Sequence, residues 1–320
     1  MDRDLIFQRA SGLGATLYMP AINPHAKRVF SGEDLHGAGS VVICLEDALH
    51  ENDIERGLAG LKASLKLRKE LGDLPQRTMV FIRPRNIGMA HLITEMEGFE
   101  TVTGLIVPKM SLANGPGWLG LAKDRNTLVM PTLETAEYFD SGYTAAVGDM
   151  FTSEGADRIM AVRLGGNDLL NVLGLRRVPG VTAQEGPLGY VLSMMSSQLM
   201  ARGLPVAAPV YDVIHDHETL AREVGMDVAR GFIGKTAIHP CQVPIIHQAL
   251  KVSRDAVEMA QAILDDRAGA VFQIRGVMCE PATHRGWARR TMARARTWGV
   301  VDEVTALQAS KEDREVAIAI

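Results

Sequence analysis

The chain has 320 residues, 47% of them hydrophobic, which is enough for a large core and suits one large α/β domain with an appendage as well as two domains. Acidic and basic residues are well mixed and the net charge is -4, which argues against nucleic acid as the main partner. No apolar run is long enough to span a membrane, the N-terminal MDRDLIFQRA does not resemble a secretion signal, and the three cysteines are far apart, so we expect a cytoplasmic protein with reduced thiols.

Eight apolar runs recur along the chain, separated by helical or loop segments. The runs do not alternate between polar and apolar residues, which is typical of strands buried on both faces of a parallel sheet. They are ATLYMPA (15–21), SVVICLED (40–47), TMVFIRP (78–84), TGLIVPKM (103–110), TLVMPTLE (127–134), RIMAVRLGG (158–166), LPVAAPVYD (204–212) and FIGKTAIHP, which ends at Pro240.

The segments between these runs have helical periodicity, most clearly over 53–71, where leucines recur among charged residues. Eight strand and helix units in about 250 residues predict a (β/α)₈ TIM barrel, an α/β fold. A doubly wound sheet is the alternative, but it needs a glycine-rich phosphate loop after an early strand, and the sequence has none in the right place. We therefore predict a catalytic barrel over 1–250 and a C-terminal helical extension over 251–320.

The predicted extension has its own elements. A helix is expected over SRDAVEMAQAILDDRAGA, ending near Gly269, followed by an extended piece, VFQIRGVMCEP, and a basic helix from about Thr283. The basic cluster RGWARRTMARAR (285–296) is either a solvated helix face or a site for phosphate or a neighbouring subunit. The sequence does not decide whether the extension packs on its own barrel or on another subunit.

Two of the runs end in an acid. The run of 158–166 stops at a glycine turn and is followed by Asp168, and the run of 127–134 ends at Glu134. In a parallel barrel such acids converge on the active-site face, where two carboxylates make an oxygen site suited to Mg²⁺. The alternative is that each acid caps the helix that follows it.

Other ionisable and polar residues also follow the runs, and a barrel brings them to one rim. An arginine fork can bind a carboxylate through two hydrogen bonds, so Arg83 is expected to hold the far end of a 2-keto acid or dicarboxylate whose carbonyl and carboxylate oxygens lie on a metal acting as a Lewis acid. The alternative for Arg83 is a structural ion pair with Glu46 or Asp47. The rim residues are Asn23, Pro24, Glu46, Asp47, Arg83, Arg85, Lys109, Glu134, Asn167, Asp168, Asp212 and Lys235 to His239.

Lysine and histidine residues offer further alternatives. A desolvated Lys109 or Lys235 could form a Schiff base with a keto acid, although nearby acids would keep a lysine charged. His215 and His217 have a spacing that can bind metal, but they fit a solvated loop or helix start better. We expect His239 to be a packed rim residue and not the general base.

The chain resembles the HpcH/HpaI aldolase and citrate lyase β-subunit superfamily, and within it the CitE-like proteins. The matching pieces run in family order over some 230 residues. They are YMPAINPHAKRVF (18–30), VVICLEDAL (41–49), VFIRPRN (80–86), GLIVPKM (104–110), MPTLETAE (130–137), RLGGNDLLNVLG (163–174), VYD (210–212) and GFIGKTAIHPCQV (231–243).

The resemblance implies a homo-oligomeric barrel, trimeric or hexameric, that acts on a small-molecule substrate. It implies Mg²⁺, with Mn²⁺ as the alternative ion, bound by Glu134 and Asp168, and a substrate carboxylate on Arg83. Glu46 and Asp47 belong to the catalytic set, near the metal or its waters. Gly166 and Asn167 are expected to contact the substrate.

The reactions that the resemblance implies are reversible cleavages of 3-hydroxy acids or their CoA thioesters, such as citryl-CoA or malyl-CoA, through a metal-stabilised enolate. Two departures from the family bear on the substrate. The chain has Arg83-Pro84-Arg85 where the family often has VRIN, and Cys279 where many acyl-CoA members have an aspartate before a proline. The sequence leaves open whether CoA is used, and a Schiff-base aldolase or a non-catalytic scaffold remains as an alternative.

Overall fold

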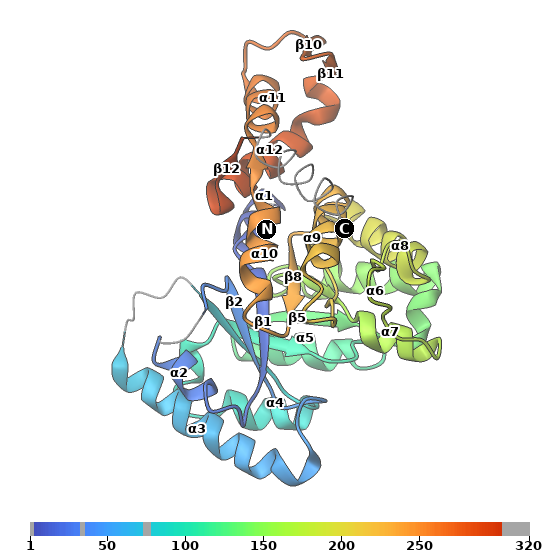
Figure 1. The fold of residues 1–320 in the computed structure, drawn as a ribbon. Helices are drawn as coiled ribbons and strands as arrows, with labels where there is room; N and C mark the ends of the chain where they lie inside the picture. The colour runs from blue at the N-terminus through green and yellow to red at the C-terminus, as the bar shows by residue number, and fades with distance from the viewer. Residues whose placement is uncertain (1–2, 33–35, 73–77, 303–320) are drawn as a thin grey trace, which may run out of the picture. The chain divides into compact units, whose positions relative to one another are not determined.

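The computed structural model describes residues 3–32, 36–72 and 78–302, which excludes the end of the predicted extension at 303–320 (Figure 1). The chain divides into two compact units, residues 1–249 and 250–320. Each unit is described below by itself.

The first unit is built on eight parallel strands. Their hydrogen-bonded order is β7-β6-β5-β4-β3-β2-β1-β8, and the bridge between Ala208 and Lys235 joins β7 to β8. The sheet therefore closes into the predicted (β/α)₈ barrel, and the doubly wound alternative is wrong. The strands are β1 (Gly14–Pro20), β2 (Ser40–Cys44), β3 (Met79–Arg83), β4 (Gly104–Val107), β5 (Leu128–Leu133), β6 (Val162–Leu164), β7 (Val206–Ala207) and β8 (Gly234–Ala237).

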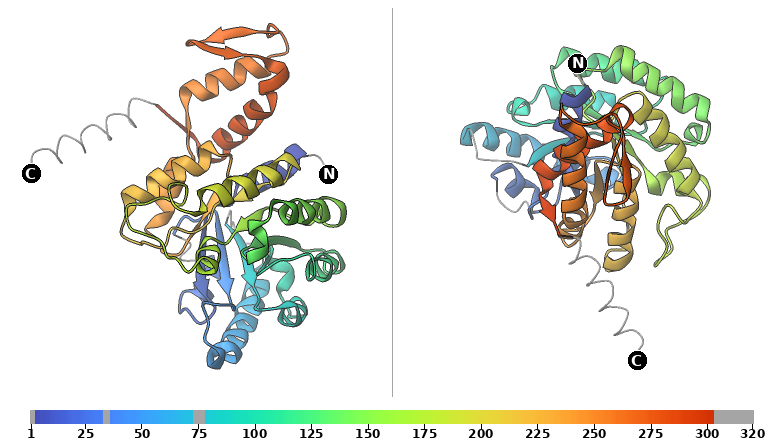
Figure 2. Two further views of the ribbon diagram at one scale, coloured as in Figure 1. Left: turned by 90° about the vertical axis from the view of Figure 1, so that its right-hand side faces the viewer. Right: turned by 90° about the horizontal axis from the view of Figure 1, so that it is seen from above.

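Helices lie between the strands and surround the sheet (Figure 2). The helix expected over 53–71 is α3 (Ile54–Leu71), which buries Leu61 and Leu65 and ends at Gly72 in the left-handed region (φ 68°). No helix within the described ranges is both long and apolar enough to cross a membrane. The other helices of this unit are α1 (Arg3–Ser11), α2 (Ala26–Phe30), α4 (Ile87–Thr94), α5 (Gly115–Asp124), α6 (Ser141–Glu154), α7 (Gly166–Val172), α8 (Leu188–Ala201), α9 (His217–Ala229) and α10 (Gln242–Leu250).

An apolar core supports the strand ends that carry the site. Val42, Phe81, Ile106 and Met130 come from the neighbouring strands β2 to β5 and are completely buried in one cluster. Burial of such side chains contributes about 1.5–3 kcal/mol each and fixes the strands that carry the polar residues. The rigid base of the site is therefore hydrophobic.

The second unit pairs two helices, α11 (Arg254–Leu264) and α12 (Pro281–Trp298), with short strands β9 (Val252–Ser253), β10 (Phe272–Ile274), β11 (Val277–Cys279) and β12 (Val300–Val301). The predicted helix end near Gly269 is wrong. The helix ends at Leu264 because Asp265 is extended and its side chain accepts a hydrogen bond from the N–H of Arg267 at 2.8 Å, a local turn that competes with helix. The predicted extended piece is a hairpin.

His247 on α10 gives the first unit a titratable tie to its first strand. Its Nε2 accepts a hydrogen bond from the backbone N–H of Ala15 at 3.1 Å, and burial lowers the pKa of His247 to about 4. In the unfolded chain the pKa is the ordinary histidine value of about 6.5. As the pH falls, the unfolded state therefore binds the proton first, and the stability that neutral His247 contributes is lost between about pH 6.5 and 4.

We expect the free energy of unfolding to fall by up to about 3 kcal/mol across this window because of His247. In His247→Gln the amide oxygen can still accept from Ala15, so this part of the pH dependence should disappear. Urea denaturation of both proteins between pH 4 and pH 8 measures the difference. Parallel pH profiles for wild type and variant contradict the expectation.

Candidate active site

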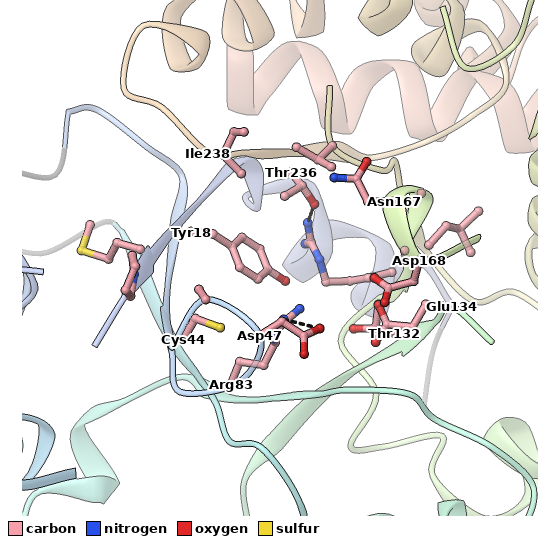
Figure 3. A pocket seen from close by; sticks show the side chains of 18 residues that line it. Tyr18, Cys44, Asp47, Arg83, Thr132, Glu134, Asn167, Asp168, Thr236 and Ile238 are labelled. Carbon is pink, nitrogen blue, oxygen red and sulfur yellow. Dashed lines mark hydrogen bonds and ion pairs between the residues drawn. The ribbon is translucent and has the colours of Figure 1, made fainter. Parts of the chain in front are cut away.

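The carboxyl ends of the barrel strands surround a cavity of about 510 Å³ (Figure 3). Its polar lining comes from β1, β2, β3, β5, β6, β8 and the start of α7, so residues far apart in sequence meet there. The lining side chains that carry polar or ionisable groups are Tyr18, Cys44, Asp47, Arg83, Thr132, Glu134, Arg163, Asn167, Asp168 and Thr236. The sequence had predicted Asp47, Arg83, Glu134, Asn167 and Asp168 among them, and Gly166 also lines the cavity.

Glu134 and Asp168 lie next to each other at one side of the cavity (Figure 3). Burial, and then repulsion by Asp168, raise the pKa of Glu134 to about 7. Within the described ranges neither acid makes a side-chain hydrogen bond that caps a helix. Asp168 lies in the first turn of α7, whose N-cap residue is Gly165, and the Glu134 carboxylate accepts from the backbone N–H of Lys109 at 2.8 Å. The structure thus brings together the two acids that were predicted to share a cation.

The surroundings of these acids fit a divalent cation. A Cβ at position 165 would collide with the Glu134 carboxylate, so glycine is needed for the end of β6 to approach it. Within the described ranges Asp168 has no hydrogen-bond or ion-pair partner, and no group of three or more His, Cys, Asp or Glu side chains could hold a metal. Two hard oxygen ligands with space for waters and substrate oxygens suit Mg²⁺ better than a metal that needs a closed cage.

A second charged cluster surrounds Arg83. Its Nη2 donates to the carboxylate of Glu46 and lies 3.8 Å from Asp47. The Nζ of Lys109 lies 3.4 Å from Glu46 and 3.6 Å from Asp47. The ion pair considered for Arg83 is therefore present, and it leaves the other N–H groups of Arg83 for a ligand.

Lys109 acts through its backbone as well as its charge. It has φ 46°, a left-handed conformation that costs a non-glycine residue about 1 kcal/mol or more and is often found at functional sites. In this conformation the backbone N–H of Lys109 donates its hydrogen bond to the carboxylate of Glu134. Partial burial alone would lower the pKa of Lys109, but the carboxylates of Glu46 and Asp47 raise it. The amine therefore stays protonated and is a poor nucleophile.

Lys235 is buried outside the cavity lining. Its Nζ donates to Glu223 at 2.7 Å and to Asp227 at 2.8 Å, and Glu223 also accepts from Arg177 at 2.6 Å. Burial alone would raise the pKa of Glu223, but the charges of Lys235 and Arg177 lower it. Burial raises the pKa of Asp227 to about 6. Lys235 is thus enclosed by two carboxylates, which argues against the Schiff-base role.

The histidines and most of the remaining rim residues lie outside the cavity lining, but Thr236 and Ile238, within the predicted 235–239, line it. Asp216, between His215 and His217, caps α9 by accepting from the N–H of Thr219 at 3.1 Å, so the two histidines sit at a helix start. His239 contacts Cys241, with 3.0 Å between Nδ1 and Sγ. Arg85 donates to the carbonyl of Leu49 at 2.7 Å.

The sequence interpretation gave no role to Tyr18, Thr236 or Arg163. Arg163 is 2% exposed, donates to Thr16 Oγ1 at 3.1 Å and to Thr236 Oγ1, and its guanidinium carbon lies 5.4 Å from the centroid of the Tyr18 ring. The guanidinium of Arg83 lies 5.7 Å from the same ring. The signal was present in the sequence, because Arg163 is the one charge inside the apolar run Ile159 to Leu164.

Known proteins similar to this chain agree in fold and in family. A family model described as a C-C bond lyase of the TIM-barrel fold matches residues 8–300. A (3S)-malyl-CoA thioesterase from Cereibacter sphaeroides is 27% identical over 291 residues, which cover 88% of this chain and 94% of that protein. A citrate lyase subunit beta-like protein from Deinococcus radiodurans is 24% identical over 238 residues, which cover 74% of this chain and 80% of that protein.

A solved structure has the same fold. It is that of CitE from Mycobacterium tuberculosis in complex with magnesium, acetoacetate and coenzyme A. The TM-score is 0.63 at 23% sequence identity, and the match covers 89% of this chain and 99% of that one.

Proposed function

The chain belongs to the C-C bond lyase family of the TIM-barrel fold, in the superfamily of the citrate lyase β-subunit and the HpcH/HpaI aldolases, and we propose that it is a Mg²⁺-dependent carbon-carbon lyase. Its substrate is a 3-hydroxy acid or the thioester of one, which it cleaves to a small oxo acid and an acyl unit, or forms from them. The proposal includes a homo-oligomeric, cytoplasmic enzyme.

One observation carries the proposal: Glu134 and Asp168 stand side by side in the cavity, and no cation of the described chain pairs with Asp168. Two adjacent carboxylates repel each other, as the raised pKa of Glu134 reflects, and a divalent cation relieves that repulsion. When bound, Mg²⁺ supplies Lewis-acid chemistry, which stabilises the negative charge that develops on the oxo acid.

The other residues have roles that follow from their contacts. Arg83 is oriented by Glu46 and offers its remaining N–H groups to a substrate carboxylate. The backbone N–H of Lys109 fixes the carboxylate of Glu134. Gly166 and Asn167 line the cavity where the substrate oxygens lie, and Asn167 supplies an amide donor and acceptor.

Cys279 stands where many acyl-CoA members have an aspartate, and its surroundings favour carbon-carbon cleavage without a following thioester hydrolysis. Cys279 is completely buried in the apolar cluster of the second unit, with Ala260, Ile263 and Ala288. A buried thiol in apolar surroundings cannot serve as the base of a thioester hydrolysis. We therefore propose lyase activity without the thioesterase step that the Cereibacter protein is named for.

Deuterium exchange into the methyl group of acetyl-CoA tests the proposal, because a lyase of this kind forms its enolate from the acyl unit and uses the oxo acid as the electrophile. In D₂O with Mg²⁺ and pyruvate, the methyl proton signal of acetyl-CoA should decay in the presence of the protein. Chelation by EDTA should stop the exchange, and added Mg²⁺ or Mn²⁺ should restore it. Exchange into the methyl group of pyruvate in EDTA, with an adduct trapped by borohydride, contradicts the proposal and indicates a Schiff-base aldolase.

A further inference from the structure

Arg163 is a buried cation in the cavity wall with no acidic partner. Its hydrogen bonds go to two neutral hydroxyls, those of Thr16 and Thr236, and within the described ranges it forms no ion pair. A guanidinium has five N–H donors, so three remain without a protein acceptor. The face of the Tyr18 ring offsets only part of the cost of burying this charge.

Pairing the positive and negative charges of the site also leaves Arg163 without a partner. Arg83 and Lys109 are matched by Glu46 and Asp47, which they contact as ion pairs. Under the proposed function, the two negative charges of the metal-binding carboxylates are matched by Mg²⁺. Arg163 is the one positive charge that these groups leave unmatched.

A second unsatisfied group lies beside Arg163. Thr132 is its register partner on the neighbouring strand β5, lines the same cavity and is 5% exposed. The Oγ1 of Thr132 is buried and has no hydrogen-bond partner among the residues that the structure describes. A buried hydroxyl without a hydrogen-bond partner, beside a buried guanidinium that has donors to spare and no ion pair within the described ranges, indicates that a ligand completes both.

We infer that Arg163 and Thr132 form a second anion subsite, which binds a carboxylate of the substrate other than the one that Arg83 binds. This inference rests on the proposed function and narrows its substrate class to dicarboxylic acids. Arg163 is then a specificity-determining residue. A carboxylate fits better than a phosphate, because a single unmatched positive charge balances a single negative charge.

Two four-carbon acids test the subsite: malate, which has a second carboxylate, and 2-hydroxybutyrate, which has a methyl group in its place. Binding of each to the full chain in the presence of Mg²⁺ is measured by calorimetry. Wild type should bind malate at least about tenfold more tightly, because charge-assisted hydrogen bonds contribute roughly ten- to a hundredfold in affinity. Arg163→Gln should lose this preference and bind 2-hydroxybutyrate as wild type does.

Two further variants separate a ligand contact from a structural role. Arg163→Lys keeps the charge without the fork and should recover part of the malate preference. Arg158→Gln removes a half-buried arginine near the start of the same run, which pairs with Asp157 outside the cavity lining, and should leave both affinities unchanged. Equal weakening of both acids in Arg163→Gln, or no preference in wild type, overturns the inference.

The proposed function fails differently. A calorimetric titration with Mg²⁺ alone reports on Glu134 and Asp168 and should be the same in wild type and in Arg163→Gln. If wild type does not bind Mg²⁺, the metal site is refuted. The malate preference, measured without metal, still reports on Arg163.

Discussion

Replacing Glu134 with glutamine is expected to reduce Mg²⁺-dependent deuterium exchange into acetyl-CoA by at least about a thousandfold, because Lewis-acid stabilisation contributes several kcal/mol. The amide keeps the size of the side chain and can still accept from the N–H of Lys109 at the Oε1 position. It removes one of the two negative charges that face the cation. Mg²⁺ affinity, measured by calorimetry, should fall with the exchange rate.

The same change should not unfold the protein. Burial and the neighbouring Asp168 raise the pKa of Glu134 to about 7, above its ordinary value, so the ionised form is penalised in the folded state. The stability that protonated Glu134 contributes to the metal-free protein is therefore lost as the pH rises from about 4.5 to about 7, and at pH 8 the glutamine variant should be the more stable by up to about 3 kcal/mol.

Glu137→Gln is the matched control, since Glu137 is exposed and lies just beyond the cavity. It should leave exchange and metal affinity unchanged. Retention of Mg²⁺-dependent exchange in Glu134→Gln contradicts the assignment of Glu134 to the metal.

Replacing Lys235 with methionine is expected to lower the free energy of unfolding by about 3–5 kcal/mol, because it leaves buried carboxylates without their cation. Lys235 is 1% exposed and donates to both Glu223 and Asp227. Glu223 keeps Arg177, so the larger part of the loss falls on Asp227. Urea denaturation measures the change.

A second substitution identifies the cause of this loss. Lys235→Met with Asp227→Asn removes the stranded charge and should recover part of the lost stability. Lys123→Met, at an exposed lysine of α5, should change stability little. Unchanged stability in Lys235→Met, together with loss of a metal-independent exchange into pyruvate, contradicts the structural role and favours Schiff-base chemistry.

The barrel could be predicted from the sequence because its strands are buried on both faces. Each therefore appears as a short, continuous apolar run, and eight such runs alternate with helical segments. The ends of the strands were harder to predict from the sequence. The run expected over 158–166 is a strand only over Val162–Leu164, with one further bridge from Ile159 to Val129, and the strand ends where the chain turns at Gly165 and its backbone lies against Glu134.

The acids at the strand ends could also be predicted, since parallel strands bring their carboxyl ends together. What could not be predicted is which charges pair. Glu223 and Asp227 are four residues apart on one face of α9 and enclose Lys235, a contact that depends on how the helix packs on β8. Arg163 was visible as a lone charge in an apolar run, but only the closed barrel shows that it lines the cavity without an acidic partner.

A crystal structure of the protein with Mg²⁺ and pyruvate tests the central claim most directly. The ion should lie about 2.0–2.1 Å from a carboxylate oxygen of Glu134 and from one of Asp168, with pyruvate oxygens or waters in its other positions. An ion bound elsewhere, or a cavity in which pyruvate binds while these two carboxylates hold no ion, contradicts the account.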